Sequence, residues 1–327
     1  MPKDFVHLHL HSEYSLLDGA CRIHEIAEEA KNAGQSAVAI TDHGVMYGVV
    51  DFYKACKKQG IKPIIGCEIY VSPGSRFNKD KVNDSDYSHL VLLCKNKDGY
   101  KNLIQIVSKA FTEGFYSKPR ADIDLLREHS EGLIALSGCL GGYIPKKIIA
   151  GDIAGAREYA LLLNQIFGQD NFYLEIQNHG IAEQKIVNST LVQLSKTTDI
   201  PLAATNEVHY LKKSDAEIQD ILMCIQMNKT LADKKSFAFE TKEFYFKSAE
   251  QMYELFESVP QALENTVKIA QMCNFEFEFD KLFLPAFYPP EELSSKQYLE
   301  KLCYEGLQKR LGQIEKSGDV FDTQEYT

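Results

Sequence analysis

Several patterns that identify common protein classes are missing from this sequence. Its eight cysteines are scattered, and no two of them form a C-x-x-C pair, which argues against a zinc ribbon and against a disulfide framework. No apolar run approaches the length of a transmembrane helix, and no apolar stretch follows a basic start at the N-terminus. These absences predict a cytoplasmic protein in a reducing environment, with no membrane partner.

Positive charge is also in deficit. The chain has 46 acidic residues against 36 lysines and arginines, a formal net charge of −10, whereas a non-specific nucleic-acid-binding protein is more often basic. Any contact with DNA should therefore be local or come from another domain. The sequence has neither a G-x-S-x-G nucleophile elbow nor a glycine-rich phosphate loop, so the chemistry of those motifs is not expected.

Apolar runs typical of strands alternate with helical patterns over the first two-thirds of the chain. We expect an α/β fold with an opening strand in the histidine-rich stretch 5–11, followed by strands at 37–44, 63–71, 89–94, 133–139, 172–177 and 201–209. Helices are expected at 23–32, 49–58, 100–110 and 153–167. This alternation favours a parallel (β/α) barrel, in which chemistry is found at the C-terminal ends of the strands.

The strand pattern fades after residue 210. Helices are expected at 215–227, 248–257, 260–272 and 294–311, with a short edge strand at 275–279 and a proline-rich linker at 285–292. We therefore expect a domain at residues 1–280, with barrel strands to about 210 and helices after them, and a second segment at residues 281–327.

Three histidines alternate with apolar residues in the opening stretch: His7, His9 and His11. On an extended backbone their side chains point to the same face. Protonated imidazoles would repel one another there, whereas neutral imidazole is the commonest metal ligand. A half-buried strand seldom spends three polar positions on one coordinating residue type, so the pattern favours a metal site.

Ligand-type residues recur at the other strand ends. The full set is His9, His11, Asp18, His43, Glu68, His89, Cys139, Glu207 and His209. Nine ligands exceed the needs of one tetrahedral ion and suit two or three divalent ions that share a carboxylate. Mixed imidazole and carboxylate ligation fits zinc, iron or manganese. Clustered ions of this kind suit phosphoester hydrolysis, with a metal-bound hydroxide as the nucleophile.

The same residues carry a resemblance to a known family. The motifs of the polymerase and histidinol phosphatase (PHP) family resemble His9-Leu10-His11-Ser12, Ser15, Asp18-Gly19, Thr41-Asp42-His43-Gly44, Glu68 and Glu207-Val208-His209. Longer stretches resemble, more specifically, the N-terminal PHP domain of bacterial DNA polymerase III alpha subunits; they include residues 7–19, 66–71, 89–93, 136–140 and 204–210. Further similar stretches reach residue 299, so the resemblance covers nearly the whole chain.

The resemblance implies a distorted seven-stranded (β/α) barrel that holds up to three metal ions. By resemblance, the first ion is held by His9, His11, Glu68 and Glu207. Glu68 bridges to a second ion held with His89 and Cys139, and a third is held by Asp18, His43 and His209. Zinc is the expected metal, with manganese and iron as alternatives. The family usually has aspartate where Glu207 stands, and the longer side chain could shift the first ion.

The resemblance also implies a function in DNA replication. It points to 3′–5′ exonuclease activity on DNA at a primer 3′ end, within a DNA-directed DNA polymerase whose palm begins in residues 281–327 and continues after Thr327. Other replicative subunits, such as a sliding clamp or a proofreading subunit, are the implied partners. Two alternatives stay open: a catalytically silent, metal-stabilised scaffold that docks a proofreading subunit, and a free-standing phosphatase of the histidinol-phosphate type.

Three further polar residues lie near the expected ligands. We expect His7 to donate a hydrogen bond to a ligand rather than to bind metal itself. Asp42 orients His43 or caps the following turn, and His179 meets a substrate phosphate or caps its own loop.

Overall fold

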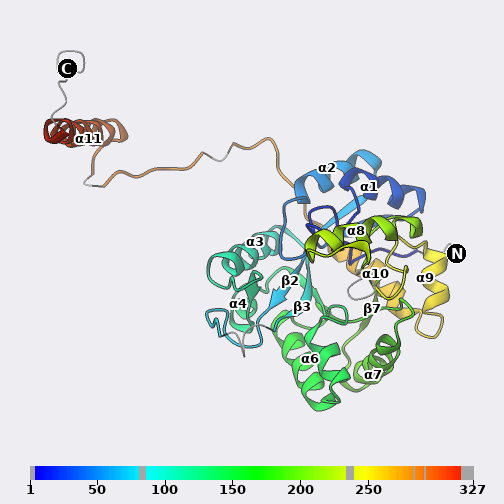
Figure 1. Cartoon of the computed structure of the whole chain (residues 1–327). Helices are drawn as coiled ribbons and strands as arrows, with labels where there is room; N and C mark the ends of the chain where they lie inside the picture. Colours follow the sequence, from blue (N-terminus) through cyan, green and yellow to red (C-terminus); the bar gives the residue numbers. More distant parts are fainter. Residues whose placement is uncertain (1–3, 81–85, 233–238, 283, 291, 318–327) are drawn as a thin grey trace. The chain divides into compact units, whose positions relative to one another are not determined.

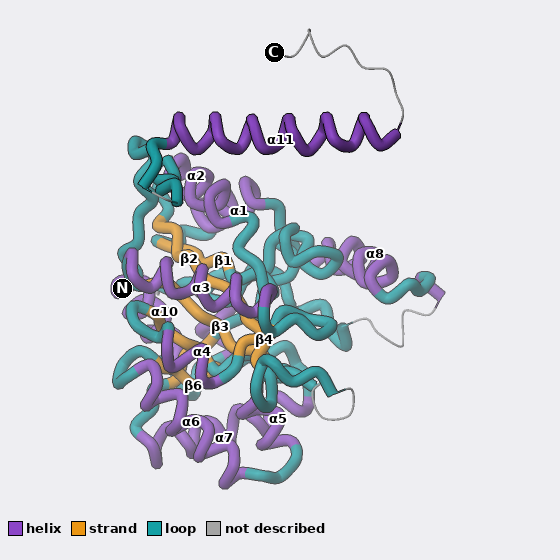
Figure 2. The backbone as a smooth tube through the Cα atoms, turned by 90° about the vertical axis from the view of Figure 1, so that its left-hand side faces the viewer, coloured by secondary structure: helices purple, strands orange, loops and turns teal. Residues whose placement is uncertain are grey.

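The computed structural model describes residues 4–80, 86–232, 239–282, 284–290 and 292–317 (Figure 1). The chain forms two compact units, Met1–Phe277 and Glu278–Thr327. The strands lie in the first unit, with helices around them (Figure 2). Among the described residues, no helix has both the length and the apolar character needed to span a bilayer.

The sheet of the first unit is curled and mixed. Its strands lie in the order β1 (Ala37–Ile40), β2 (Lys62–Val71), β3 (Ser88–Cys94), β5 (Leu133–Leu136), β6 (Phe172–Ile176) and β7 (Leu202–Ala204), and the short β4 (Arg120–Ala121) pairs with the C-terminal end of β2. The expected α/β fold, a distorted barrel, is confirmed.

The expectation that all strands run parallel is wrong at β3. This strand is antiparallel to both of its neighbours, β2 and β5. The residues described between β2 and β3 contain no helix. Because a parallel neighbour needs a long crossover connection, a chain that returns without a crossover helix pairs in the antiparallel sense.

The histidine-rich opening stretch closes the sheet without forming the regular strand that we expected. His7 pairs with Val38 of β1, and Leu10 pairs with Val208 just beyond β7. The chain bends at His9, whose carbonyl accepts a 3.1 Å hydrogen bond from the Val208 amide. The stretch therefore joins the two edges of the curled sheet.

Helices follow most of the strands and cover the sheet. They are α1 (Ile23–Asn32), α2 (Val49–Gln59), α3 (Lys97–Thr112), α4 (Ile123–Glu128), α5 (Tyr143–Ile149), α6 (Ile153–Phe167) and α7 (Ala182–Thr198). The expected helices at 23–32, 49–58, 100–110 and 153–167 are confirmed as α1, α2, α3 and α6. Local signals explain the helix ends: the Asn96 side chain caps α3 by accepting hydrogen bonds from two backbone amides, and left-handed Gly60 ends α2.

The chain after β7 is mainly helical. A short 3-10 turn (Lys213–Asp215) precedes α8 (Ala216–Gln226), α9 (Ala249–Leu255) and α10 (Gln261–Met272), and α11 (Ser295–Ser317) belongs to the second unit. The expected edge strand at 275–279 is wrong, since these residues form no strand. Phe275 stacks on Tyr100 of α3 with ring centres 4.4 Å apart, and Phe277 meets Tyr53 of α2 edge-on at 5.1 Å. These aromatic residues pack against helices instead of pairing in the sheet.

Candidate metal centre

The nine expected ligands come from loops and strands that meet at one rim of the sheet. His9, His11 and Asp18 belong to the opening stretch and its loop, His43 follows β1, Glu68 lies within β2, His89 lies near the start of β3, Cys139 follows β5, and Glu207 and His209 follow β7. His89 reaches this rim because β3 is reversed, so that Ser88 at its start pairs with Val71 at the end of β2.

The carboxylate of Glu68 is the centre of the cluster. Its oxygens lie 3.3 Å from His9 Nε2, 3.4 Å from His11 Nε2, 2.7 Å from His43 Nδ1 and 3.0 Å from His89 Nδ1. Burial alone raises the pKa of Glu68, but the surrounding histidines outweigh it and hold the pKa well below its ordinary value. Glu68 is therefore an anion with imidazole nitrogens around both of its oxygens.

The ligand set expected for the first ion lies together. One ligand atom from each of His9, His11, Glu68 and Glu207 lies within 4.8 Å of the others. Glu207 has a left-handed backbone with φ of +41°, which is uncommon for a residue other than glycine. With this backbone conformation, the carboxylate of a side chain one methylene longer than aspartate lies within the cluster.

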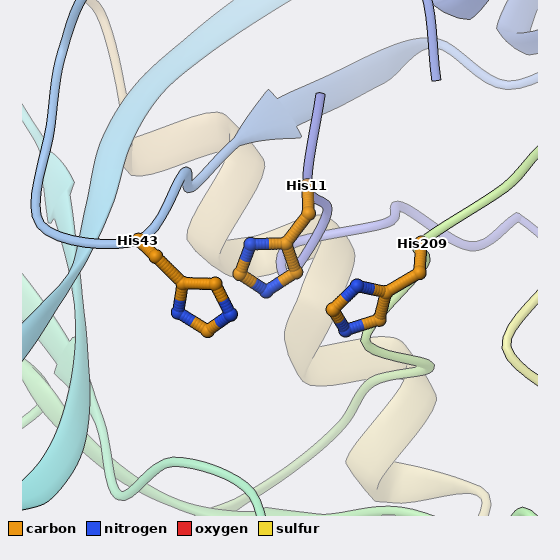
Figure 3. Close-up of side chains that lie close together, drawn as sticks. All are labelled: His11, His43 and His209. Carbon is orange, nitrogen blue, oxygen red and sulfur yellow. The ribbon is translucent and has the colours of Figure 1, made fainter. Parts of the chain in front are cut away.

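Two of the ligands expected for the third ion, His43 and His209, lie together in the structure, and His11 joins them. One nitrogen from each of His11, His43 and His209 lies within 4.8 Å of the others, and the His11 ring stacks on both neighbours at 4.1 and 4.4 Å between ring centres (Figure 3). Asp18 lies 2.9 Å from His43 Nε2 and 3.6 Å from His209 Nδ1. Burial and the neighbouring imidazoles lower the pKa of His11 well below its ordinary value, so His11 is neutral, the form that binds metal.

Cys139 and His89 approach the bridging carboxylate from a further side. Cys139 Sγ lies 3.7 Å from Glu68 Oε1 and 3.7 Å from His89 Nδ1. His43 also belongs here, since its ligand atom lies within 4.8 Å of those of Glu68 and His89. Burial, together with the charges of Glu207 and Glu68, raises the pKa of Cys139 well above its ordinary value. A thiolate at this position therefore requires a cation beside it.

The hydrogen bonding of the cluster fits cations. Buried ligand atoms without a hydrogen-bond partner include His9 Nε2, His11 Nε2, His43 Nδ1, Glu68 Oε2 and both nitrogens of His209. His43 Nδ1 and Glu68 Oε2 lie 2.7 Å apart but lack the alignment of a hydrogen bond. Unsatisfied buried polar atoms are costly and rare. A group of them that consists of metal-ligand atoms facing one another fits divalent metal ions.

A buried acid that the sequence analysis missed orients His9. Glu175 Oε1 lies 2.7 Å from His9 Nδ1 and also accepts hydrogen bonds from Gln177 Nε2 at 3.1 Å and from Thr205 Oγ1. Glu175 Oε2 accepts a hydrogen bond from the Gly138 amide at 3.0 Å. A carboxylate in this place holds the proton of His9 on Nδ1 and leaves Nε2 for the cluster. The available sequence signal is a lone acid inside an apolar strand.

Asp42 acts on His11 through a serine. Its carboxylate accepts hydrogen bonds from the amide and hydroxyl of Ser12 at 2.6 and 2.8 Å and from the Ser15 hydroxyl at 2.8 Å. Ser15 Oγ lies 3.0 Å from His11 Nδ1 and accepts a 3.1 Å hydrogen bond from the His43 amide. Since Ser15 donates its own proton to Asp42, it accepts the Nδ1 proton of His11 and leaves Nε2 for the cluster.

His7 and His179 are held by contacts outside the cluster. His7 Nε2 lies 3.0 Å from the Lys247 carbonyl. His179 Nε2 lies 2.9 Å from the Asn206 carbonyl, and its Nδ1 lies 2.8 Å from Gln184 Nε2. Burial lowers the pKa of His7 to about 3 and that of His179 to about 4. His7 is therefore a neutral core residue, and His179 braces the loop after β7.

Comparison with known proteins identifies a family and several relatives that this chain resembles. A model of the PHP domain matches residues 7–179. The chain is 46% identical over 308 residues to the DNA polymerase III subunit alpha of Treponema pallidum, a match that covers 94% of this chain and 26% of that protein. It is 47% identical over 310 residues to the same subunit of Borreliella burgdorferi, covering 94% of this chain and 27% of that protein. The chain thus spans about a quarter of the length of these curated relatives.

Among solved structures, an amidohydrolase from Chromobacterium violaceum with bound sulfate aligns with a TM-score of 0.42 and 14% identity, covering 62% of this chain and 87% of that one. The match to the PHP domain covers more than half of the 327 residues. The chain therefore belongs to the PHP domain family.

Proposed function

We propose that the chain is the PHP domain of a DNA polymerase III alpha subunit, and that its cluster binds two or three divalent metal ions and hydrolyses the 3′ end of a DNA strand. The observation that carries this proposal is the convergence of four histidines on the buried carboxylate of Glu68. Two-ion sites of phosphatases and nucleases hold their ions about 3.5–4 Å apart. A carboxylate with imidazoles around both oxygens suits that spacing.

The residues divide into three proposed ligand sets. The first is His9, His11, Glu68 and Glu207; the second is Glu68, His89 and Cys139; the third is Asp18, His43 and His209. Zinc is the metal that we propose, because imidazole, carboxylate and thiolate together suit it, whereas manganese and iron suit the nitrogen and oxygen ligands. Such ions supply Lewis-acid activation of water and offset the charge of a phosphoester.

The protein's own side chains prepare the cluster for a substrate. Glu175 and Ser15 accept the Nδ1 protons of two ligand histidines, so that both Nε2 atoms face inward. Asp18, His43 and His89 are the most exposed of the ligands, at 16%, 14% and 18%, so a phosphodiester approaches from their side. Burial of the remaining ligands excludes water and strengthens every electrostatic interaction with that substrate.

The curated relatives suggest the larger setting of this domain. We propose that residues 1–280 are the PHP domain and that residues 281–327, of which 283, 291 and 318–327 lie outside the described residues, lead into a polymerase palm. In that setting the DNA-directed DNA polymerase activity belongs to the remainder of the longer protein. The proposed partners are a DNA primer 3′ end, a sliding clamp and a proofreading subunit, all in the cytoplasm.

Glu207 favours a second function, a metal-stabilised scaffold without catalysis that docks a proofreading subunit. Its left-handed backbone and longer side chain make the first ligand set differ from one built on aspartate. An ion could be held there in a position that stabilises the fold without hydrolysing DNA. A free-standing phosphatase of the histidinol-phosphate type is disfavoured, because the similarity to polymerase subunits extends over 94% of this chain.

The test is elemental analysis of the purified chain, paired with release of the 3′-terminal nucleotide from labelled single-stranded DNA, with and without a chelator. Two or three ions per chain and chelator-sensitive release support the nuclease. Glu68→Gln should lose both, and Glu217→Gln, which changes a 75% exposed carboxylate on α8, is the matched control that should lose neither. Bound metal with only the background release of the Glu68→Gln protein supports the scaffold. A chain that binds no metal refutes both functions.

A further inference from the structure

The loops that carry Asp18 and His43 present large apolar side chains to solvent. Leu16 is 65% exposed, Leu17 is 39% exposed and Tyr47 is 61% exposed. Single exposed apolar residues are common on protein surfaces. These three differ because each stands within four residues of a proposed metal ligand.

The two leucines form the tip of a tight turn. The amide of Asp18 donates a 3.0 Å hydrogen bond to the carbonyl of Ser15, which closes a four-residue turn with Leu16 and Leu17 at its centre. Leu17 has φ of +62°, a conformation that favours glycine or asparagine. A leucine here both strains the backbone and exposes apolar surface, so folding alone does not explain it.

The leucine turn and the loop 43–48 touch at two points. The His43 amide donates a 3.1 Å hydrogen bond to Ser15 Oγ. The ring of Tyr14 packs against Gly48 so closely that a Cβ atom added there would lie 2.6 Å from it. Both contacts hold the leucine tip and the loop that carries the exposed tyrosine beside each other, at the open side of the cluster.

We propose that Leu16, Leu17 and Tyr47 form a rim that binds the bases of single-stranded DNA at its 3′ end. The inference rests on the proposed phosphodiesterase function, because a phosphodiester held near Asp18 and His43 carries its bases toward these loops. A tyrosine ring can stack on any base, since every base has a π face, and apolar side chains can wedge between neighbouring bases. Such a rim selects a nucleotide polymer over a small phosphoester that has no base.

The test measures DNA binding by fluorescence anisotropy of the metal-loaded chain, with an oligonucleotide whose 3′ linkage is a phosphorothioate that resists hydrolysis. A second oligonucleotide has an abasic 3′ end. Tyr47→Ala should weaken binding of the first oligonucleotide by about tenfold, the range of a single stacked base, and Leu16→Ser should also weaken it. Both variants should leave binding of the abasic oligonucleotide unchanged. The matched controls are Tyr304→Ala and Ile186→Ser, which change residues that are 70% and 58% exposed elsewhere and should not alter binding.

Leu17→Gly separates a role in binding from a role in folding. Glycine adopts positive φ without strain, so this variant should weaken DNA binding while its melting temperature stays the same or rises. The proposal is overturned if the three rim variants bind the first oligonucleotide as the wild type does. It is also overturned if the wild type binds ordinary and abasic ends equally, or binds neither.

Nucleotide release from an ordinary oligonucleotide then distinguishes this inference from the proposed function. Base-dependent binding that the rim variants lose, without any metal-dependent release by the wild type, supports the rim and refutes the nuclease. Release with the same KM in the wild type and in Tyr47→Ala supports the nuclease and overturns the rim.

Discussion

Replacing Glu175 with glutamine tests whether the cluster is built for metal, because Glu175 acts on it through His9. The carboxylate accepts hydrogen bonds from His9 Nδ1 at 2.7 Å, Gln177 Nε2 at 3.1 Å, Thr205 Oγ1 and the Gly138 amide at 3.0 Å. An amide of the same shape accepts at only one of its two positions. We expect its oxygen at the Oε1 position, where three of the donors meet, so that its NH₂ group faces the Gly138 amide.

Two costs follow from this exchange. A buried donor left without an acceptor costs about 1–3 kcal/mol, and this cost falls on the Gly138 amide. The hydrogen bond to His9 also loses its charge, and a charge-assisted hydrogen bond is roughly twice as strong as a neutral one. Loss of such a partner of a metal-binding histidine lowers metal affinity by about 10- to 100-fold, which is about 1.4–2.7 kcal/mol of binding free energy.

The assay is zinc binding in competition with a chelator, together with urea unfolding with and without zinc. The zinc Kd of Glu175→Gln should rise by about 10- to 100-fold. At a fixed concentration of free zinc, the stabilisation given by the metal should shrink by about the matching 1.4–2.7 kcal/mol. Glu217→Gln again serves as the control. A Glu175→Gln protein that is less stable without metal but binds zinc with wild-type affinity would refute the reasoning, because Glu175 would then only support packing.

Further outcomes concern three other residues in and around the metal-ligand cluster. His43→Ala should lower metal content and melting temperature together, because metal ligands contribute to folding stability; unchanged metal content with an unchanged melting curve contradicts this. Glu207→Asp should stabilise the metal-free chain by less than about 1 kcal/mol in urea unfolding, since aspartate adopts the left-handed conformation more readily; a loss of stability argues against backbone strain. Burial lowers the pKa of His179 to about 4 from an ordinary value of 6.5, so the unfolded chain binds the proton first and stability is lost as pH falls from 6.5 toward 4. Between pH 7 and pH 5, the lowered pKa of His179 should reduce the free energy of unfolding of the wild type by about 2 kcal/mol. His179→Gln should not show this part of the loss. Equal losses in both proteins would rule out a buried neutral imidazole at this position.

One rule of sheet geometry was enough to bring several of the ligands together from sequence. The C-terminal ends of parallel strands share an edge, and this places His43, Cys139 and His209 at the same edge without any knowledge of their contacts. His89 joined the set for a different reason. It lies near the start of its strand, and only the reversed direction of β3 brings it to the same rim. The antiparallel direction of β3 depends on the lack of a crossover helix before it. In the sequence, this lack is harder to recognise than the apolar run of a strand.

His7 shows a limit of prediction from sequence patterns, and Glu175 shows what an energetic argument can add. The alternation that grouped His7 with His9 holds only on a regular strand, and the chain bends at His9, so the His7 ring turns to the carbonyl of Lys247. Glu175 lies in a strand as apolar as the one that carries Glu68, and its side chain is 0% exposed. A buried carboxylate costs several kcal/mol unless it is paired and hydrogen-bonded, so an acid inside an apolar strand implies partners at that point of the fold. This argument selects Glu68 as a ligand and applies with the same force to Glu175. The cost of burying a carboxylate is therefore a sequence signal that identifies both the ligand Glu68 and Glu175, which orients a ligand, whereas motif spacing identifies only the ligands.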